Sequence, residues 1–451
     1  MRRSVNNQLP LVPAPVGHKH VRELQAMGTI LDAHPEFANW VRADLLAGGI
    51  TPGRGRKGMS GEHVLRVLVI KQSNGFSYDD LTFHLIDSQS YRTFCLMSLA
   101  DRPPKKSTLQ RNLKAVRAET LERINRALVA YAQAQGFEDG RRLRADATVI
   151  EAAILEPTDS RLLVDCVRVL NRLLREAREY VALTYTNHHR RAKRRALAIR
   201  HSAKAEQRVP LYRDLVKVAK NTVADARLSV EKLEEHYPPE AFQQPELREL
   251  RAKLQHFAKL ADRVLDQTCR RVFEGETVPA QQKIVSIFEP HTDIIRKDRR
   301  ETLYGHKVFL TAGASGLIVD CTVERGNPAD STKAVQLAKR AIKVLGINPE
   351  QIVFDGGFSS RENLGEIKAL GIRDVAFSKA PGLAIKDMVK RTWLYQRLRN
   401  FRAGIEGVIS YLKRCFGWDR CAWRSYGSFR AYTWGSVIAV NLVMLARHAL
   451  A

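Results

Sequence analysis

Gln351-Ile-Val-Phe-Asp-Gly-Gly-Phe358 decides how the C-terminal part of this chain folds. The stretch begins as a short run of apolar and β-branched residues, which predicts a buried strand over 351–355. Asp355 ends that strand, and the two glycines after it leave room for a ligand close to the backbone. In an open α/β sheet, ligands bind in the crevice at the carboxyl ends of the strands. Asp355 is therefore the first candidate site residue.

Strand and helix patterns alternate on both sides of this stretch. Upstream, the residues after Arg141 alternate between apolar and polar and are partly β-branched, so they predict a strand that carries Asp146. A carboxylate inside a sheet needs a counter-ion to offset its desolvation, which makes Asp146 the second candidate. Further elements are expected as strands at 283–288, 305–311, 317–323 and 374–377 and as helices at 331–344 and from 361, with the strands at 305–311 and 317–323 forming a hairpin. We predict an α/β fold with a mixed sheet and flanking helices.

The first 135 residues show helical periods separated by loops, and they predict an all-α domain over 1–135. Helices are expected at 62–72 and 77–87, and a third is expected to start after Ser107 as its N-cap, with loops rich in Pro, Gly and basic residues at 51–58 and 101–106. The arrangement suits a helix-turn-helix reader of DNA, with Arg111 and Lys114 near the start of the third helix. Three short helices also pack together in proteins that never contact DNA, so both interpretations stay open.

A long helical region interrupts the strand pattern between residues 161 and 283. It predicts a basic helical insertion in a catalytic domain made of residues 136–160 and 284–451. The run His188-His-Arg-Arg-Ala-Lys-Arg-Arg195 is either a solvated helix face or a surface that follows DNA phosphates. The net charge of the chain favours the second interpretation, in which the contacts are Arg190, Arg191, Lys193 and Arg194.

Composition narrows the class of protein. The chain has 451 residues, 44% of them hydrophobic, and 74 Lys and Arg against 48 Asp and Glu leave a formal charge of +26. This charge attracts polyanions, so nucleic acid is the expected partner. The six Cys form no C-x-x-C pair, which indicates neither disulfides nor a zinc site. No apolar run approaches the roughly 20 residues of a membrane span, and Pro residues interrupt Met1–Gly17, so we expect a cytoplasmic protein without a membrane partner.

A third acidic residue lies in the stretch Arg399-Asn-Phe-Arg-Ala-Gly-Ile-Glu406-Gly-Val-Ile-Ser-Tyr-Leu-Lys413. On a helix, Arg399, Arg402, Glu406 and Lys413 lie on one stripe, with three cations around one carboxylate. The stripe could be an ordinary exposed face of ion pairs. However, Asp146, Asp355 and Glu406 meeting at a sheet edge could hold two Mg²⁺ ions, which together promote the cleavage of a phosphodiester.

Other acidic residues receive different interpretations. Asp159 and Asp165 remain possible substitutes for Asp146, and Glu151 follows it closely. Asp320 is expected to face solvent in the hairpin, and Asp330 with Ser331 suits a helix cap. Ser359 and Glu362 are expected to form a capping box.

Some aromatic and basic residues also have two interpretations. His306 beside Lys307 could contact phosphate, although a single His in a strand is more often packed or hydrogen-bonded. Trp393, Trp418, Trp423 and Trp434 are expected to pack in a core or an interface rather than to stack on bases. Residues 434–445 predict a closing amphipathic helix.

At these residues the sequence resembles a DDE transposase of bacterial insertion sequences. Arg402, Glu406 and Lys413 match the signature Y-x2-R-x3-E-x6-K of one group of these enzymes, and the likeness is greatest to the ISNCY type. Arg399 occupies the Tyr position of the signature, which is a departure. The resemblance extends over most of the chain and includes the segments 75–81, 157–163, 305–307 and 355–358 as well as the strand around Asp146.

The resemblance implies a ribonuclease H-like catalytic core with Asp146, Asp355 and Glu406 as the ligands of two Mg²⁺ ions, for which Mn²⁺ can substitute. It also implies an enzyme that binds the terminal inverted repeats of its element, hydrolyses the DNA there and joins the freed 3′-hydroxyl to target DNA. Such an enzyme acts on double-stranded DNA as a homodimer or larger oligomer. The residues expected to contact DNA, besides those of the insertion and the N-terminal domain, are Arg399, Arg402, Lys413, Arg414, Arg420 and Lys307. Two alternatives remain: an inactive or domesticated DNA-binding protein, and a nuclease of the same fold.

Overall fold

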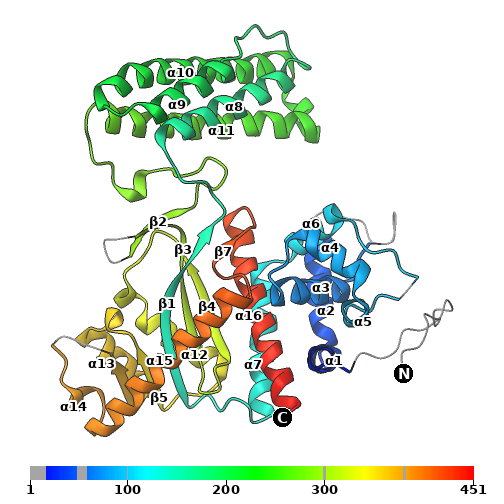
Figure 1. Cartoon of the computed structure of the whole chain (residues 1–451), viewed down its shortest axis with the longest axis vertical. Helices are drawn as coiled ribbons and strands as arrows, with labels where there is room; N and C mark the ends of the chain where they lie inside the picture. The colour runs from blue at the N-terminus through cyan, green and yellow to red at the C-terminus, as the bar shows by residue number, and fades with distance from the viewer. Residues whose placement is uncertain (1–16, 48–57, 99, 298–300, 379–381) are drawn as a thin grey trace, which may run out of the picture.

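The computed structural model describes residues 17–47, 58–98, 100–297, 301–378 and 382–451. The expected basic loop at 51–58 lies outside the described residues except for Gly58, and so does the segment Met1–Gly17 except for Gly17. Figure 1 shows a central sheet, a group of N-terminal helices beside it and a separate bundle of long helices beyond one end of the sheet. The expected α/β class with a mixed sheet is confirmed.

The strand β1 (Arg142–Ala152) lies in the middle of the sheet. Its pairing partners are β3 (Glu301–Ala312, antiparallel) on one side and β5 (Gln351–Phe354, parallel) with β7 (Arg420–Cys421, parallel) on the other. The outer strands are β2 (Asp293–Lys297) and β4 (Ile318–Glu324), both antiparallel to β3, and β6 (Asp374–Phe377), parallel to β5. The strand that carries Asp146 and the hairpin of β3 and β4 are therefore confirmed.

The strand expected at 283–288 is wrong. This segment follows the short 3-10 helix η2 (Ala280–Gln282) and has no strand assignment, and the next strand is β2. The apolar residues that suggested a strand, Ile284 and Ile287, are buried in the hydrophobic cluster of the helical insertion. A short apolar run can be buried against helices as well as in a sheet, so its composition alone did not decide between the two.

Helices cover both faces of the sheet. Asp146 and Arg144 lie on the face that contacts α15 (Thr392–Cys415), because alternate residues of a strand point to the same side. The opposite face, which includes Asp320, contacts α12 (Ala334–Leu345). The helix α13 (Arg361–Ala369) and the short helix α14 (Ile385–Met388) lie at the β6 end of the sheet (Figure 1). The expected helices at 331–344 and from 361 are confirmed, the first shortened by the 3-10 helix η3 (Asp330–Thr332).

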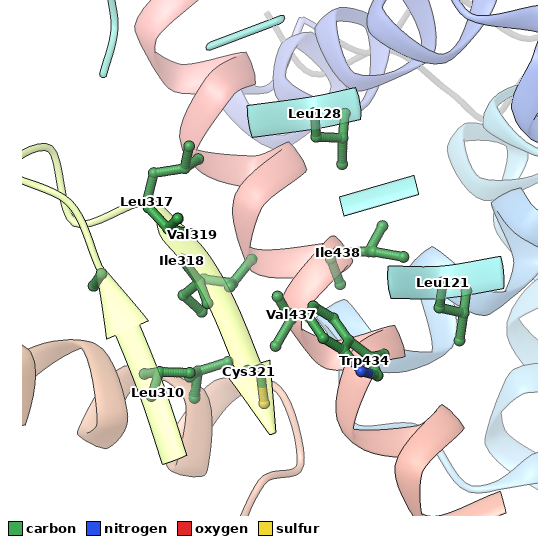
Figure 2. Packing of buried hydrophobic residues seen from close by; sticks show 14 of the residues in the cluster. Leu121, Leu128, Leu310, Leu317, Ile318, Val319, Cys321, Trp434, Val437 and Ile438 are labelled. Atoms are coloured by element: carbon green, nitrogen blue, oxygen red, sulfur yellow. The ribbon is translucent and has the colours of Figure 1, made fainter. Parts of the chain in front are cut away.

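The last helix, α16 (Tyr426–Ala449), joins the sheet to the N-terminal helices (Figure 2). Its side chains Trp434, Val437 and Ile438 lie between β4 and α7 (Ala118–Ala134). The Asn441 side chain accepts a hydrogen bond from the Ile318 N–H and donates to the Ile318 carbonyl, and it also donates to Asn125 of α7. The N-terminal helices and the sheet therefore share one hydrophobic core.

The same helix corrects one expectation from the sequence. By length and composition alone, the 24-residue helix α16 is apolar enough to cross a membrane. However, 89% of its most apolar 18-residue stretch is buried inside the protein. The sequence pattern had suggested a helix only over 434–445 and no run of spanning length. A central core helix is apolar on all sides because it is surrounded by protein, so its composition is weak evidence for a membrane.

Only helices precede β1 in the described residues. They are α1 (Lys19–Asp32), α2 (Pro35–Leu46), α3 (Gly61–Ser73), α4 (Tyr78–Asp87), α5 (Gln89–Phe94), α6 (Lys106–Ala115) and α7. Ser77 and Asp80 form a capping box at the start of α4. The N-cap expected at Ser107 is wrong, because α6 begins at Lys106 with Lys105 in the N-cap position and no side-chain cap.

The helical insertion folds around its own hydrophobic cluster. It consists of α8 (Asp159–Ala177), α9 (His189–His201), α10 (Ala205–His236), the short η1 (Pro239–Gln243) and α11 (Pro245–Val272). The strongly amphipathic α8 packs against α9, α10 and α11. Figure 1 shows this bundle connected to the sheet through the segment after β1 and the segment before β2.

Candidate acidic site at the sheet edge

The three acidic residues selected from the sequence come from three different elements. Asp146 lies in β1, Asp355 follows the last residue of β5, and Glu406 lies in the middle of α15. The strands β1 and β5 are parallel neighbours in which Ala145 pairs with Phe354. Asp146 is the residue after Ala145 and Asp355 is the residue after Phe354, so the two aspartates lie at the same level of adjacent strands. The helix α15 brings Glu406 toward them.

One side chain contacts all three carboxylates. An Nη atom of Arg402 lies 3.1 Å from Oδ2 of Asp146 and 3.3 Å from Oδ1 of Asp355, and the other Nη lies 2.9 Å from Oε1 of Glu406. The Glu406 contact follows from the i, i+4 spacing on α15, whereas the other two join the helix to the sheet edge. The structure thus brings the three acids around a single cation.

Burial differs strongly among these groups. The side chains of Asp146 and Arg402 are each 14% exposed, whereas Asp355 is 46% and Glu406 is 65% exposed. The pKa of Asp146 is raised from 3.8 to about 6, mainly by burial and also by the neighbouring Asp355 and Glu406, against the lowering effect of the Ala147 N–H and Arg402. A cation that approaches this carboxyl group stabilises its charged form.

A close approach between α15 and β1 makes these contacts possible. The Arg144 guanidinium donates to the Phe401 carbonyl at 3.1 Å and lies 4.8 Å from the centre of the Phe401 ring. A Cβ atom at Gly404 would lie 1.9 Å from Nη1 of Arg144. Glycine at 404, two residues from both Arg402 and Glu406 in the sequence, therefore leaves the space that Arg144 fills.

A cavity of about 390 Å³ opens beside Asp355 and Arg402. Its lining also includes Ser378, Arg399 and Asn400. In the described part of the chain, the buried Oγ of Ser378 and the buried Nε of Arg402 have no hydrogen-bond partner. Ser378 and Asn400 are not recognisable from the sequence as site residues, because only the tertiary structure places the residue after β6 beside the middle of α15.

The other basic residues expected near the site differ in their partners. Lys307 lies 2.6 Å from Oδ1 of Asp330 and donates to the Pro328 carbonyl, so its ammonium group is occupied within the chain. Arg420 donates to the Ile154 carbonyl and Arg414 to the Ser410 carbonyl. Arg399 and Lys413 form no ion pair with any described residue. Among the described residues, Lys413, Arg414 and Arg420, which follow Glu406, therefore have no acidic partner, whereas Arg430 and Arg447 further along pair with Glu119 and Glu23.

The cations of the basic run at 188–195 differ in whether they pair with an acidic residue. Arg191 and Arg195 both pair with Asp214 of α10, which places them against the bundle. Arg190, Lys193 and Arg194 have no ion-pair partner in the described residues, and neither have Arg111 and Lys114 of α6. Arg191 was expected to contact DNA, and its charge is instead at least partly neutralised within the insertion.

The acidic residues considered as alternatives are engaged elsewhere. Asp159 pairs with Arg271 at 2.8 Å and Asp165 with Arg168 at 2.7 Å, both within the insertion. The expectation that Asp320 faces solvent is wrong, because its side chain is 1% exposed and bonds Arg340 of α12.

Two expected caps are also corrected. Asp330 starts the 3-10 helix η3 and pairs with Lys307. The cap of α13 is Ser360, which accepts from the Asn363 N–H, rather than Ser359. The one-residue difference arises because η4 (Gly356–Phe358) extends the turn after Asp355, and the Ser359 hydroxyl donates to the Gly356 carbonyl.

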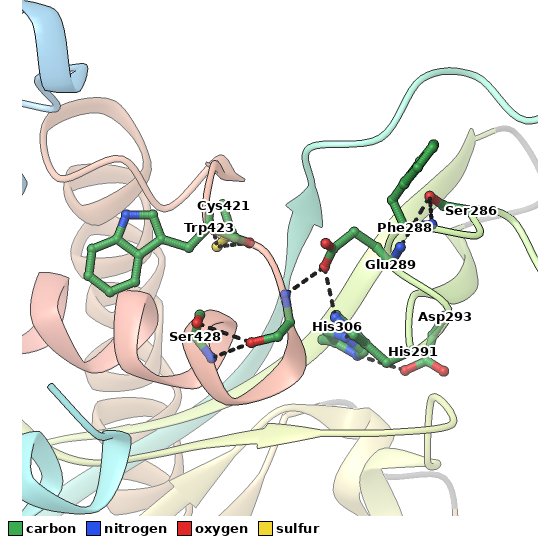
Figure 3. A network of polar contacts seen from close by, with 10 residues as sticks. Ser286, Phe288, Glu289, His291, Asp293, His306, Cys421, Trp423 and Ser428 are labelled. Carbon is green, nitrogen blue, oxygen red and sulfur yellow. Dashed lines mark hydrogen bonds and ion pairs between the residues drawn. The ribbon is translucent and has the colours of Figure 1, made fainter. Parts of the chain in front are cut away.

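A second polar network surrounds His306 (Figure 3). His306 is fully buried; one ring nitrogen lies 2.9 Å from Oδ2 of Asp293 and the other lies 2.8 Å from a ring nitrogen of His291. His291 in turn contacts Glu289, which accepts from the Ser425 N–H ahead of α16. The packed and hydrogen-bonded interpretation of His306 is therefore confirmed, and the network connects β2 and β3 with the last helix.

Three of the four tryptophans considered in the sequence are buried, namely Trp418, Trp423 and Trp434, as expected for core residues. Trp393, at the start of α15, is 54% exposed. Throughout the described residues, no three His, Cys, Asp or Glu side chains converge in an arrangement that could directly hold a metal ion. The three carboxylates around Arg402 supply the right donor atoms for a hard divalent cation, with the guanidinium in contact with all of them.

Two parts of the chain match known families of transposase domains. Residues 263–442 match the family described as "Transposase DDE domain", and residues 19–115 match "Transposase domain (DUF772)". The first match contains Asp355 and Glu406, whereas Asp146 lies upstream of it. An "Uncharacterized protein ORF8 in nfe locus" of Rhizobium meliloti is 27% identical over 173 residues, which cover 37% of this chain and 82% of that protein. No solved structure matches the chain.

Proposed function

We propose that this chain, a transposase of the DDE type, binds the terminal inverted repeats of a bacterial insertion sequence and cleaves and joins DNA with Asp146, Asp355 and Glu406 as the ligands of two Mg²⁺ ions. A DDE domain implies dependence on a divalent metal and DNA as the partner. The observation that carries the proposal is the meeting of these three carboxylates around Arg402.

The three carboxylates would hold the metal ions from three different elements of the fold. Asp146 on the rigid central strand and Asp355 at the end of β5 supply a fixed pair of carboxylates, and Glu406 adds a third from a helix packed against the sheet. Bound divalent cations would supply activation of the attacking oxygen and stabilisation of the leaving oxygen of the phosphodiester. Mg²⁺ suits oxygen ligands of this kind, and Mn²⁺ would substitute for it.

The DNA would lie across the basic residues without acidic partners. Arg399, Lys413 and Arg414 belong to α15, the helix of Glu406, and Arg420 follows in β7, so all four would hold phosphates near the acids. Arg190, Lys193 and Arg194 would extend this surface onto the insertion, and Arg111 and Lys114 onto the N-terminal helices. Arg191 and Lys307 would contribute less to this surface, because Arg191 shares Asp214 with Arg195 and Lys307 pairs with Asp330.

The proposal includes three finer assignments. The mixed sheet with flanking helices is assigned as a ribonuclease H-like core that carries a helical insertion between β1 and β2. We assign the enzyme to the ISNCY type on the basis of the signature around Glu406, in which Arg399 stands in place of Tyr. Since two element ends must be brought together, the active assembly is a homodimer or larger oligomer acting on DNA in the bacterial cytoplasm.

The test is metal-dependent cleavage of a DNA fragment that carries the flanks of the gene. Wild type is compared with Asp146→Asn, Asp355→Asn and Glu406→Gln, which keep the shape of each side chain and remove its charge. We expect cleavage at defined ends, followed by joining to a second DNA, in wild type alone, while all variants still bind DNA. Cleavage that persists in the three variants would refute the ligand assignment, and binding without any cleavage by wild type would favour an inactive DNA-binding protein. Cleavage without joining would identify a nuclease.

A further inference from the structure

The Arg402 side chain stands where a cation is needed. Its guanidinium contacts one oxygen of each of Asp146, Asp355 and Glu406 at 2.9 to 3.3 Å. Mg²⁺ binds carboxylate oxygens at about 2.0–2.1 Å, so an ion that shares these oxygens must occupy much of the space between them. A metal ion and the guanidinium therefore compete for the same three groups.

We propose that Arg402 is an internal counter-ion of the metal-free enzyme, which holds the three carboxylates together and must leave them when metal binds. The inference rests on the proposed function, because it takes these carboxylates as the metal ligands. It assigns to Arg402 a positioning role that the resemblance to the transposase signature does not provide.

The charges explain why such a counter-ion is needed. Three carboxylates near one another repel, and Asp146 is largely buried, where an unpaired charge is costly. The one positive charge of Arg402 relieves part of this repulsion in the absence of metal. It cannot relieve all of it, so the site keeps a net negative charge that attracts divalent cations.

The surroundings of Arg402 provide a place for the displaced side chain. The cavity of about 390 Å³ beside Asp355 is lined by Arg402 itself, by Ser378 and Asn400 as neutral polar neighbours and by the cationic Arg399. The buried Nε of Arg402 and the buried Oγ of Ser378 have no hydrogen-bond partner in the described residues, so both can form new bonds when the guanidinium moves. A guanidinium released into this cavity lies beside the acids with its donors available for a DNA phosphate.

The direct test is Mn²⁺ binding to the full chain without DNA, measured by calorimetry for wild type and Arg402→Gln. Removing the competing charge is expected to tighten Mn²⁺ binding by about tenfold, within the range of typical coupling between two ligands. Arg402→Lys, which keeps the charge without the planar fork, is expected to fall between the two. Arg397→Gln is the matched control, because Arg397 is an exposed residue of the same helix with no ion pair among the described residues.

A second readout follows the arginine itself. Phenylglyoxal modifies accessible guanidinium groups, and mass spectrometry of the digested chain reports the modification of Arg402 separately from other arginines. We expect slow modification without metal, since the side chain is 14% exposed, and faster modification when Mn²⁺ is added. A purely structural ion pair would show no increase.

The outcomes separate this inference from the proposed function. Equal or weaker Mn²⁺ binding by Arg402→Gln, with binding still lost in Asp146→Asn, would overturn the counter-ion role and leave the metal ligands in place. No Mn²⁺ binding by either wild type or Arg402→Gln, with both folded by circular dichroism, would overturn the ligand assignment and the inference with it. If Arg402→Gln and Arg397→Gln both bind Mn²⁺ more tightly than wild type, the effect comes from the net charge of the protein. That result would also reject the specific counter-ion role of Arg402.

Discussion

Lys71 offers a prediction in which the sign and the size of a stability change follow from burial. Its side chain lies in α3 at 4% exposure, with the ammonium 5.2 Å from the Tyr78 ring centre and 5.8 Å from that of Tyr432. Burial lowers the pKa of Lys71 from 10.5 to about 8, and Cys421 opposes this shift. At neutral pH the folded chain therefore holds a buried ammonium group.

The substitution Lys71→Met removes the charge and keeps a similar length of side chain. Lowering the pKa from 10.5 to about 8 corresponds to about 3 kcal/mol, since each pKa unit costs about 1.4 kcal/mol. Loss of the attraction between the ammonium and the two rings gives back about 1–2 kcal/mol. We expect Lys71→Met to raise the free energy of unfolding by about 2 kcal/mol at pH 7.

The pH dependence of the stability difference between wild type and Lys71→Met is a second, independent test of its sign. Because the unfolded pKa of Lys71 is higher than the folded pKa, the unfolded chain binds more protons between pH 8 and 10.5. The stability of wild type, relative to the variant, is therefore expected to rise across this window. The full penalty applies below pH 8, and the advantage of Lys71→Met disappears toward pH 10.5.

The assay is urea unfolding followed by tryptophan fluorescence. All five tryptophans lie outside the insertion at 161–283, so this signal reports the body that contains Lys71. The variant and wild type are compared at pH 7, 8.5 and 10, and only the difference between them is interpreted, so that other titrating groups cancel. A Lys71→Met chain that is less stable at pH 7, or a difference that does not shrink with rising pH, would refute the argument from burial.

Two further predictions are also tested by urea unfolding. The insertion has its own hydrophobic cluster, so Leu254→Ala, at a buried position of α11, is expected to destabilise the insertion by about 2–5 kcal/mol. This loss should appear in an unfolding transition followed by circular dichroism and leave the tryptophan transition unchanged, whereas Leu128→Ala in α7 should shift the tryptophan transition alone. A shift of both transitions in either variant would show that the insertion and the rest of the protein unfold together. Gly305→Ala is expected to cost about 3 kcal/mol or more or to prevent folding, because its Cβ would lie 2.0 Å from the Ile150 carbonyl oxygen and 2.7 Å from Glu151 Cα, both backbone atoms. Gly365→Ala in α13 is the control, since nothing lies within 4 Å of its added Cβ, and equal stability of the two variants would contradict the close-contact argument.

The sequence by itself determined the elements whose patterns are local. The alternation around Asp146, the hairpin of β3 and β4 and the apolar run before Asp355 predicted strands that the structure contains, because the side-chain period of a strand is visible in the sequence. The charge stripe of α15 likewise followed from helical spacing. These patterns sufficed to select three carboxylates that the fold then brings together.

Only the tertiary structure decided how the charged groups are paired. Asp320 was expected in solvent and is buried against Arg340 of a helix that starts 14 residues later in the chain. Arg191 and Lys193 lie two residues apart in one basic run, yet Arg191 pairs with Asp214 and Lys193 has no acidic partner in the described residues. An ion pair between distant residues depends on which helix face turns inward, and spacing in the sequence does not record this.

The role of Arg402 shows the same limit at the site itself. Its spacing from Glu406 on one helix was visible in the sequence, whereas its contacts with Asp146 and Asp355 depend on how closely α15 approaches the sheet edge. At that approach the Arg144 side chain occupies the space beside Gly404 that a Cβ atom would otherwise take. Local periodicity therefore determined which residues form the strands and the helix, and packing between them decided which charges meet, because electrostatic contacts act over a few ångströms in space and not along the chain.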